Sequence, residues 1–233
     1  MVRLGRRPPT PHRLTRYKAN WTERWRRIAN RDAKGDWATR AAKKILRGAL
    51  EDLTHGKCAF CESRPRATGD VEIEHCIAKT TDIDLAFEWA NLLPACHNCN
   101  RTKGDTNPPN TAIRPDRDDP ELYFWINPAN GELEPLSDSN AAMVESVRLT
   151  VDLFDLNRGE LCVNRLHLME IVKRWWQRVK EAGENVPPDL AEELREFVDP
   201  KTHHKLALRQ ILKQAALTDL VEIDRRGFER RAD

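Results

Sequence analysis

The stretch Cys58-Ala59-Phe60-Cys61 is followed by Ile73-Glu74-His75 and then by Cys96-His97-Asn98-Cys99-Asn100-Arg101-Thr102-Lys103, and these three segments decide the fold. Residues 62–95 separate the two Cys-x-x-Cys pairs, a spacing at which four thiolates suit one tetrahedral zinc ion. An ion with four thiolate ligands has no open coordination position, so its role would be structural. A segment of about fifty residues buries too little apolar area to fold alone, and zinc sites of this kind contribute roughly 10–16 kcal/mol in small peptides. We therefore expect structural zinc to be held by Cys58, Cys61, Cys96 and Cys99.

The composition is that of a globular chain, with 39% hydrophobic and 33% charged residues. No run of about 18 apolar residues is present, so a membrane-spanning helix is not expected. The N-terminus lacks the apolar region of a secretory signal. Tight cysteine pairs favour metal binding in a reducing compartment, and we expect a cytoplasmic protein. The other two cysteines, Cys76 and Cys162, are expected to be small buried side chains.

The net charge of +2 does not indicate a nucleic-acid-binding protein, but the charge is unevenly distributed. Residues 1–22 carry six Lys or Arg and no acidic residue, and arginine pairs occur at 225–226 and 230–231. Residues 55–105 instead contain six Lys or Arg and eight Asp or Glu. Attraction for phosphate would therefore come from the ends of the chain, from flanking helices or from a partner. The prolines and arginines of residues 1–19 predict an extended arm, either a docking element or a disordered solubilising end.

Apolar residues recur at helical spacing on both sides of the cysteine-rich segment. Two helices are expected within residues 21–54, with Asp36 as a possible N-cap of the second and Gly56 just past its end. Residues 139–217 predict four further helices, the longest over residues 158–182.

The middle of the chain predicts short strands around a single helix. Residues 71–75 alternate as a strand does, residues 91–94 suit a loop or strand end, and a helix should begin at Asn98 or Cys99 and end at Gly104. Asn130-Gly131 predicts a hairpin between strands within 122–128 and 133–136. We therefore expect an α+β fold, mainly α-helical, with a small zinc-stabilised core. The expected units are a basic arm (1–19), N-terminal helices (20–56), the cysteine-rich core with its hairpin (57–137) and a helical region suited to docking a partner (138–233).

Glu74 and His75 are the candidates for hydrolytic chemistry. Adjacent residues of a strand point to opposite faces, so one side chain can hold a metal while the other faces an attacking water. Asn100 follows the last cysteine of the zinc set, and we expect it to be a second metal ligand at the start of a helix. Carboxylate and amide oxygens suit Mg²⁺ or Mn²⁺ better than a second zinc ion.

The order of these residues resembles the HNH endonuclease motif, also called the ββα-metal fold. The resemblance implies that His75 is the general base that deprotonates water and that Glu74 is the acidic metal ligand. It also implies that Asn91 braces the loop, that Asn100 is the final metal ligand and that Lys103 sits near phosphate. Many members have Asp at the position of Glu74 and His at that of Asn100, which favours Mg²⁺ or Mn²⁺ over softer ions here.

A second resemblance extends over roughly residues 16–175. It is to the HNH subunit of the Septu anti-phage system and of retron-associated relatives. It implies a nuclease that acts on phage DNA together with an ATPase of the ABC/SMC type, and it places Lys79 near phosphate beside Lys103. The segments that carry it are Arg16-Tyr17-Lys18, Ile73 to Lys79, Phe87 to Leu93, Ile126-Asn127-Pro128 and Leu156-Asn157-Arg158.

The sequence thus predicts metal-assisted phosphodiester hydrolysis, with 5′-phosphate and 3′-hydroxyl products. Two alternatives are compatible with the same cysteines. One is a four-cysteine zinc module that binds DNA or protein without cutting, and the other is an adaptor subunit whose nuclease site is degenerate. His97, between the second pair of cysteines, could replace Asn100 as a metal ligand.

Overall fold

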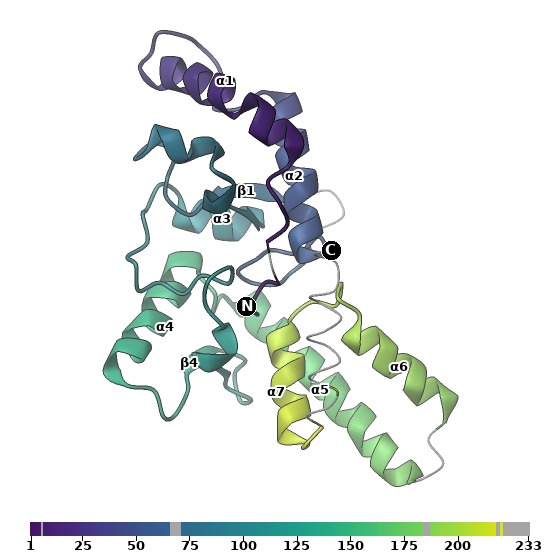
Figure 1. Ribbon diagram of the computed structural model, residues 1–233. Coiled ribbons are helices and arrows are strands. Elements are labelled where there is room, and N and C mark those ends of the chain that lie inside the picture. The colour runs from purple at the N-terminus through teal and green to yellow at the C-terminus, as the bar shows by residue number, and fades with distance from the viewer. Residues whose placement is uncertain (6, 66–70, 184–186, 218–219, 221–233) are drawn as a thin grey trace.

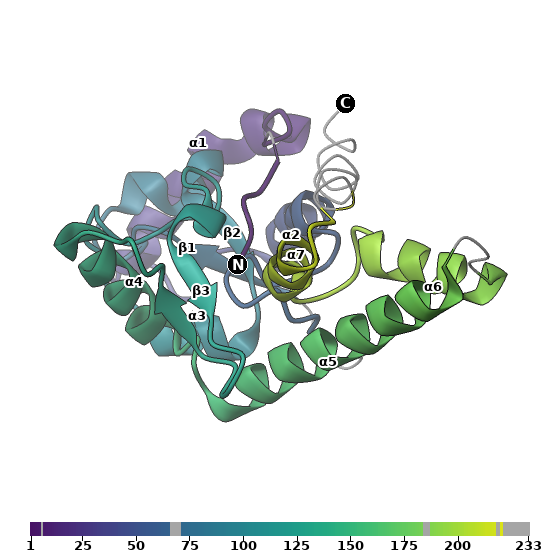
Figure 2. The ribbon, with the colours of Figure 1, turned by 90° about the horizontal axis from the view of Figure 1, so that it is seen from below.

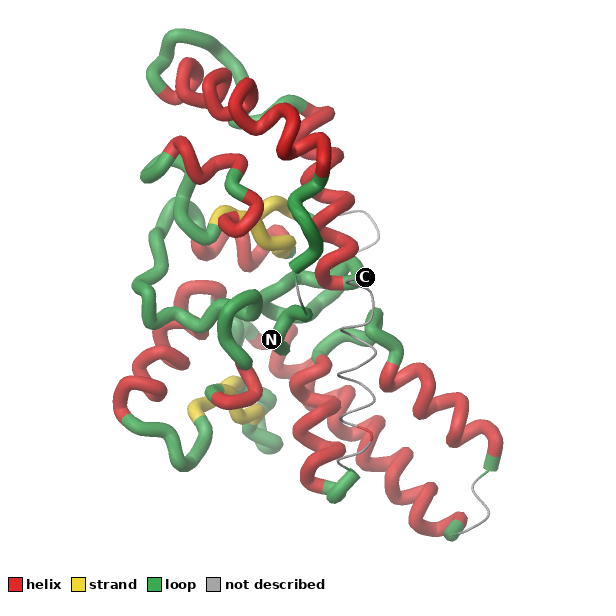
Figure 3. Tube along the Cα trace, viewed as in Figure 1, coloured by secondary structure: helices red, strands yellow, loops and turns green. Residues whose placement is uncertain are grey.

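The computed structural model describes residues 1–5, 7–65, 71–183, 187–217 and 220. Helices dominate it, and the strands occur as two short pairs (Figure 3). The predicted mainly helical α+β fold is therefore confirmed. In chain order, the helices and strands of the described residues are α1 (His12–Ala29), α2 (Arg40–Thr54), β1 (Glu72–His75), β2 (Leu92–Ala95), α3 (His97–Lys103), β3 (Phe124–Ile126), β4 (Leu133–Pro135), α4 (Ala141–Phe154), α5 (Gly159–Ala182), α6 (Pro188–Val198) and α7 (Lys205–Gln214), with 3₁₀ turns at Ile83–Phe87, Trp89–Asn91 and Pro120–Leu122.

Helices α1 and α2 lie at one end of the molecule, next to the β1–β2 pair (Figure 1). Three residues of α2 spaced four apart, Ala42, Leu46 and Leu50, are completely buried. They form a small core with Leu14 of α1 and with residues of the two 3₁₀ turns before β2. This core fixes α2 against the strand pair that carries the candidate site.

The N-cap of α2 is Thr39, whose hydroxyl accepts a hydrogen bond from the Ala42 N–H at 3.1 Å. The capping role predicted for Asp36 is therefore wrong, and the Asp36 carboxylate pairs with Lys43 instead. Gly56 lies just past the end of the helix, as predicted, with a φ of 75° that glycine adopts without strain.

The first residues of the chain differ from the expected arm. The apolar ones lie in the main core: Met1, Val2 and Leu4. Arg7 turns inward because its guanidinium donates to the carbonyl oxygens of Trp89 at 2.7 Å and Leu92 at 2.8 Å. Helix α1 already begins at His12, after a proline that suits a helix start. Arg6 and the arginine pairs near the C-terminus lie outside the described residues.

Strands β1 and β2 pair antiparallel, and α3 follows β2 after a single residue. Glu74 is paired with Leu93 and His75 with Leu92. All four residues of β2 are buried, since Leu92 packs in the small core and Leu93 in the main core. Helix α3 ends at Gly104 (φ 52°), so the predicted strand and helix of this unit are confirmed.

The predicted hairpin is present as the β3–β4 pair. Gly131 in its loop has a φ of 76°, and a Cβ at this position would lie 2.3 Å from the carbonyl oxygen of Cys162. The turn therefore requires glycine both for its backbone angle and for its close approach to the start of α5.

The C-terminal helices pack beside the hairpin, with α5 running along one edge of the molecule and α7 lying against it (Figure 2). The main core contains residues from all four predicted units, from the first residues of the chain to α7. The predicted units therefore share one core, and their boundaries at residues 56 and 137 stay a prediction. Among the described residues, no helix combines the length and apolar character that a membrane span requires.

Candidate metal centre and the Glu74–His75 strand

The four paired cysteines converge on one buried point. Their sulfur atoms all lie within 4.8 Å of one another, and the Sγ atoms of Cys61 and Cys96 are 3.7 Å apart. A tetrahedral zinc ion with Zn–S bonds of about 2.3 Å requires its sulfurs to be about 3.8 Å apart. Hydrogen bonds from the other thiols, that of Cys58 first, hold the pKa of Cys61 well below its ordinary value. The four residues therefore fit a structural zinc ion.

Backbone hydrogen bonds place these cysteines. The first pair sits in a tight loop closed by bonds from the Cys58 N–H to the Ser63 oxygen and from the Glu62 N–H to the Cys58 oxygen, both 3.0 Å. The Ala59 N–H joins this loop to β2 through the Pro94 oxygen at 2.9 Å. In the second pair, Cys96 caps α3 and Cys99 lies in its first turn. A zinc ion held by these four cysteines would fasten the loop, β2 and α3 together.

Arg158, at the start of α5, also touches the cluster. Its guanidinium donates to the sulfur of Cys99 at 3.7 Å and to that of Cys96 at 3.9 Å. Four thiolates around one Zn²⁺ carry a net charge of −2, which a neighbouring guanidinium partly offsets. Arg158 therefore connects the cysteine cluster to the C-terminal helices.

One face of β1 points at α3. Glu72 accepts hydrogen bonds from the Asn100 amide and from Nδ1 of His97, the latter at 2.9 Å. Glu74, two residues further along the same face, pairs with Lys103 at 2.6 Å. Asn100 and Lys103 are three residues apart and share one side of α3. The strand and the helix thus enclose a compact patch of two carboxylates, one amide and one ammonium.

Glu74 is almost completely buried, with 1% of its surface exposed. Burial raises the pKa of its carboxyl group to about 7, although the charge of Lys103 opposes this rise. Glu72 is half-buried, and its pKa is lowered because the hydrogen bonds from Asn100 and His97 outweigh the effect of burial. The patch therefore contains one carboxylate, Glu72, that is charged at pH 7 and one carboxyl group, Glu74, whose pKa lies close to pH 7.

His75 points to the other face of β1. Its ring lies edge-on to Trp37 at 4.7 Å, and its Nε2 atom is 3.0 Å from the carbonyl oxygen of Ala86. A carbonyl oxygen only accepts, so Nε2 carries the proton and Nδ1 keeps a lone pair. Burial lowers the pKa of His75 to about 3. The imidazole is therefore neutral at pH 7 and has one defined atom that can take up a proton.

Asn91 holds the loop that follows β1. Its Oδ1 accepts from the Ile77 N–H at 2.8 Å, and its Nδ2 donates to the carbonyl oxygens of Ile77 at 2.9 Å and Leu85 at 3.0 Å. The Asn91 carbonyl also accepts from the Cys76 N–H at 2.8 Å. These contacts fix the backbone directly after His75.

Glu74 and His75 thus lie on β1 and Asn100 and Lys103 on α3, whereas Asn91 ends a 3₁₀ turn and Lys79 follows β1 in a turn. His75 and Asn100 make their contacts on different faces of β1. Lys103 is 2% exposed, and its ammonium also donates to the His75 carbonyl at 2.7 Å, so it is not presented to solvent. Lys79 is half-buried, and its charge acts on both Glu74 and His75. In the described part of the chain, the cysteine set is the only group of three or more His, Cys, Asp or Glu ligand atoms found close together.

Comparison with known proteins gives distant relatives. A Septu protein PtuB from Bacillus thuringiensis is 32% identical over 105 residues, which cover 45% of this chain and 37% of that protein. A second PtuB, from Bacillus mycoides (strain KBAB4), is 27% identical over 145 residues, or 52% of this chain and 49% of that protein. The "Retron Vc95 putative HNH endonuclease" of Vibrio cholerae serotype O1 biovar El Tor is 26% identical over 135 residues, or 55% of this chain and 65% of that protein. No protein-family model matches the chain.

The chain is a distant homologue of Septu PtuB and of this retron protein. The matched part spans less than half the length of either PtuB protein. The predicted resemblance is therefore confirmed at the level of distant homology.

Two residues of the site were not predicted from the sequence. Glu72 lies two positions before Glu74, and the alternation of a strand could have placed it on the same face. Arg158 had no such signal, because 59 residues separate it from Cys99.

Proposed function

We propose that this chain is a metal-dependent HNH-type endonuclease that hydrolyses phosphodiester bonds of DNA. The observation that carries the proposal is the neutral, oriented imidazole of His75, directly after the buried carboxyl group of Glu74. Both residues lie on β1, which pairs with β2, the strand that runs into the cysteine cluster and α3. The distant homology to the Vc95 retron protein supports the same reaction class.

Glu74 and Asn100 are the proposed ligands of a catalytic Mg²⁺ or Mn²⁺ ion, and Glu72 is added to them. These side chains offer the hard oxygen atoms that such ions prefer, and Glu72 and Asn100 already touch. The buried carboxyl group of Glu74 already pairs with the ammonium of Lys103, so the surroundings of Glu74 accommodate a positive charge. When bound, the divalent ion would stabilise negative charge on the phosphate and on the leaving oxygen.

The other residues act around this patch. In the proposed reaction, Nδ1 of His75 accepts a proton from the attacking water. Asn91 holds the loop after β1 and so fixes the direction of the imidazole. Lys103 favours the charged form of Glu74, while Lys79 is left as the cation that can approach phosphate.

The biological setting is proposed from homology alone. The relation to Septu PtuB supports a role in a defence system. From the resemblance described in the sequence analysis, we further propose a cytoplasmic location, phage DNA as substrate and an ABC/SMC-type ATPase as partner. Coexpression with the candidate ATPase, followed by purification through the ATPase, tests the partnership. A stable complex is expected, and loss of the chain during purification would contradict it.

Two histidine variants test the catalytic assignment. His75→Ala should cut supercoiled plasmid about 10²- to 10⁴-fold more slowly in Mg²⁺ or Mn²⁺, with the zinc content and circular dichroism unchanged. His97→Ala changes an exposed imidazole only 22 residues away and should retain most of the activity. Equal cutting by His75→Ala and the parent would refute the assignment. An equal loss in both variants would instead show that His97 matters to catalysis, as a metal ligand or through its contact with Glu72.

A second candidate function is a non-catalytic subunit that binds DNA or protein. It is favoured by the closure of the patch, where Glu74 is buried and occupied by Lys103. A titration of Mg²⁺ and Mn²⁺ with plasmid, with and without the ATPase, separates the two functions. If zinc-loaded protein cuts the plasmid under none of these conditions, the non-catalytic function is established.

A further inference from the structure

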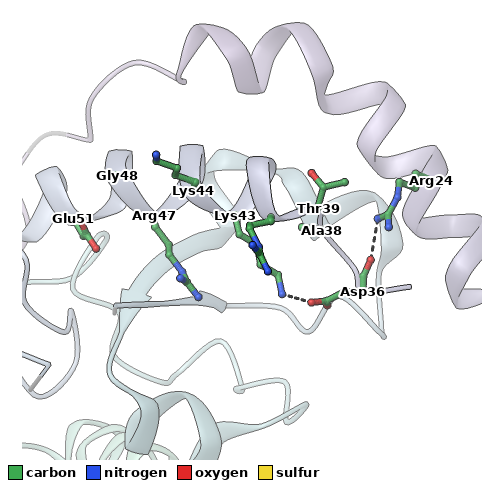
Figure 4. A pocket seen from close by; sticks show the side chains of 10 residues that line it. Arg24, Asp36, Ala38, Thr39, Lys43, Lys44, Arg47, Gly48 and Glu51 are labelled. Atoms are coloured by element: carbon green, nitrogen blue, oxygen red, sulfur yellow. Dashed lines mark hydrogen bonds and ion pairs between the residues drawn. The ribbon is translucent and has the colours of Figure 1, made fainter. Parts of the chain in front are cut away.

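A basic groove of about 910 Å³ lies along α2, on the side that faces α1 and the connecting loop (Figure 4). The side chains that line it include five cations and two carboxylates. The cations are Arg24 of α1 and Arg40, Lys43, Lys44 and Arg47 of α2. The surplus of positive charge contrasts with residues 55–105, where acidic residues are in excess. The groove therefore supplies the attraction for anions that the cysteine-rich core lacks.

The cations of α2 lie on one face of the helix, because they recur at i, i+3, i+4 and i+7. Residues 37–50 contain no acidic side chain, and two like-charge pairs, Arg40 with Lys44 and Lys43 with Arg47, stand four residues apart. Such pairs repel one another along a helix. Within the described residues, neither Arg40 nor Lys44 forms an ion pair, and both are exposed. An anion in the groove would relieve this repulsion.

The carboxylate at one end of the groove is already engaged. Asp36 pairs with Lys43, and its carbonyl oxygen accepts from Arg24 at 2.9 Å (Figure 4). Gly48 lines the other end, and a Cβ at this position would meet nothing within 4 Å. The glycine thus leaves room for a ligand to approach the helix beside Arg47.

The helix that lines the groove lies against the Glu74–His75 strand. Helix α2 packs directly on β1. Burial, the hydrogen bonds from Asn100 and His97, and the charge of Arg47 all act on the pKa of Glu72. The charge of Lys79 reaches Asp36 in the groove as well as Glu74 and His75 on the strand. A ligand that follows α2 past Arg47 therefore arrives at the carboxylate patch.

We propose that this groove binds the sugar–phosphate backbone of the nucleic-acid strand that reaches the Glu74–His75 site. The proposal rests on the nuclease function proposed above. The span from Arg40 to Arg47 is about 10 Å along the helix axis at 1.5 Å per residue. A B-form duplex places one phosphate of each strand per 3.4 Å of its axis, so a parallel segment of this length carries about three phosphates of one strand. Cations so spaced suit a regular polyanion, and the contacts would be independent of base sequence.

The test compares two double variants in a His75→Ala background, so that the DNA stays intact. Arg40→Ala/Lys44→Ala removes two exposed charges from the groove, and Arg174→Ala/Lys180→Ala removes two exposed charges from α5. Both positions in the groove are helical and exposed, where alanine preserves the fold. Zinc content and circular dichroism verify this for each protein.

Binding is measured by fluorescence anisotropy with a fluorescein-labelled 30-base-pair duplex over a series of KCl concentrations. The groove variant should bind at least about tenfold more weakly, and the slope of log K against log salt should fall by about 1.8 for two lost contacts. The α5 variant should stay within about twofold of its parent. Equal binding by both variants, or a parent that binds no duplex, overturns the proposal.

Cleavage by the same variants with His75 intact separates the groove from the reaction. Slower cutting by the groove variant alone supports the groove as the route to the site. If the chain binds through the groove but never cuts, the nuclease function fails and the groove stands. If it cuts and the groove variant is unaffected, the groove fails and the nuclease function stands.

Discussion

Asn91 allows a direct measurement of how firmly the loop after β1 is held. Asn91→Ala removes three hydrogen bonds, of 2.8 to 3.0 Å, at a side chain that is 5% exposed. At about 1 kcal/mol for each bond, the free energy of unfolding should fall by about 3 kcal/mol. Asn107→Ala is the matched control, because it also removes bonds to this loop. The Asn107 side chain accepts from the Ala78 N–H at 2.8 Å and donates to the Thr81 hydroxyl at 2.7 Å. Asn107 is exposed, so water can replace the lost partner, and the expected loss is about 1 kcal/mol or less.

The assay is urea unfolding of zinc-loaded protein, followed by circular dichroism, with thermal melting as a second measure. For a chain of this size, 3 kcal/mol corresponds to a fall in Tm of about 6–12 °C. Asn91→Asp should be no better than Asn91→Ala, because it turns the donor into an acceptor that faces two carbonyl oxygens. Equal losses for Asn91→Ala and Asn107→Ala would refute the reasoning and leave Asn91 as an ordinary loop residue.

Three other predictions follow from the described contacts. Metal analysis should find one zinc per chain; Cys96→Ser should lose it and unfold, whereas Cys162→Ser should keep it, and zinc retained by Cys96→Ser would contradict the four-thiolate site. The pKa of Glu74 is raised to about 7, so its carboxylate gains a proton below that pH and the cleavage rate should fall there. A tenfold higher Mg²⁺ concentration should shift the pH at which the cleavage rate falls by up to about one unit toward acid. His75, with a pKa of about 3, should add no further change in rate above pH 4. A change in rate whose midpoint does not depend on Mg²⁺ would point to another group. Gly131→Ala should lower the free energy of unfolding by about 2 kcal/mol or more, because its Cβ would meet the Cys162 carbonyl, whereas Gly48→Ala should raise it by up to about 1 kcal/mol. Calorimetry that finds Gly131→Ala more stable than Gly48→Ala would be inconsistent with the packing.

Local sequence signals predicted the local structure well. The alternation before His75, the cysteine spacing and Asn130-Gly131 each specify a strand, a helix start or a turn within a few residues, and those elements formed where expected. The packing of residues 1–5 and 7–11 against the core was not predicted, because proline and arginine content is typical of a solvent-exposed arm. Their structure depends on distant partners, such as the carbonyl oxygens of Trp89 and Leu92 that Arg7 reaches across more than 80 residues.

The candidate site shows the same division. The cysteines and Glu74-His75 could be identified because their chemistry is contained in short motifs. The pairing of Lys103 with Glu74 could not, since it depends on how α3 lies along β1, and it places an expected phosphate contact inside the protein. The basic face of α2 was also not predicted as a binding site, because its closeness to the candidate site depends on how α2 packs on β1.

Glu62 follows the first cysteine pair, and its carboxylate accepts from the N–H groups of Lys205 at 3.1 Å and Leu206 at 3.3 Å, in the first turn of α7. These partners are 143 and 144 residues away, which is on the order of ten seconds of ribosomal synthesis. The nascent chain can therefore offer its thiols to zinc well before α7 emerges to pack on the main core. A product truncated before α7 would lack these two N–H donors, and the apolar residues of the main core that pack on α7 would stay exposed.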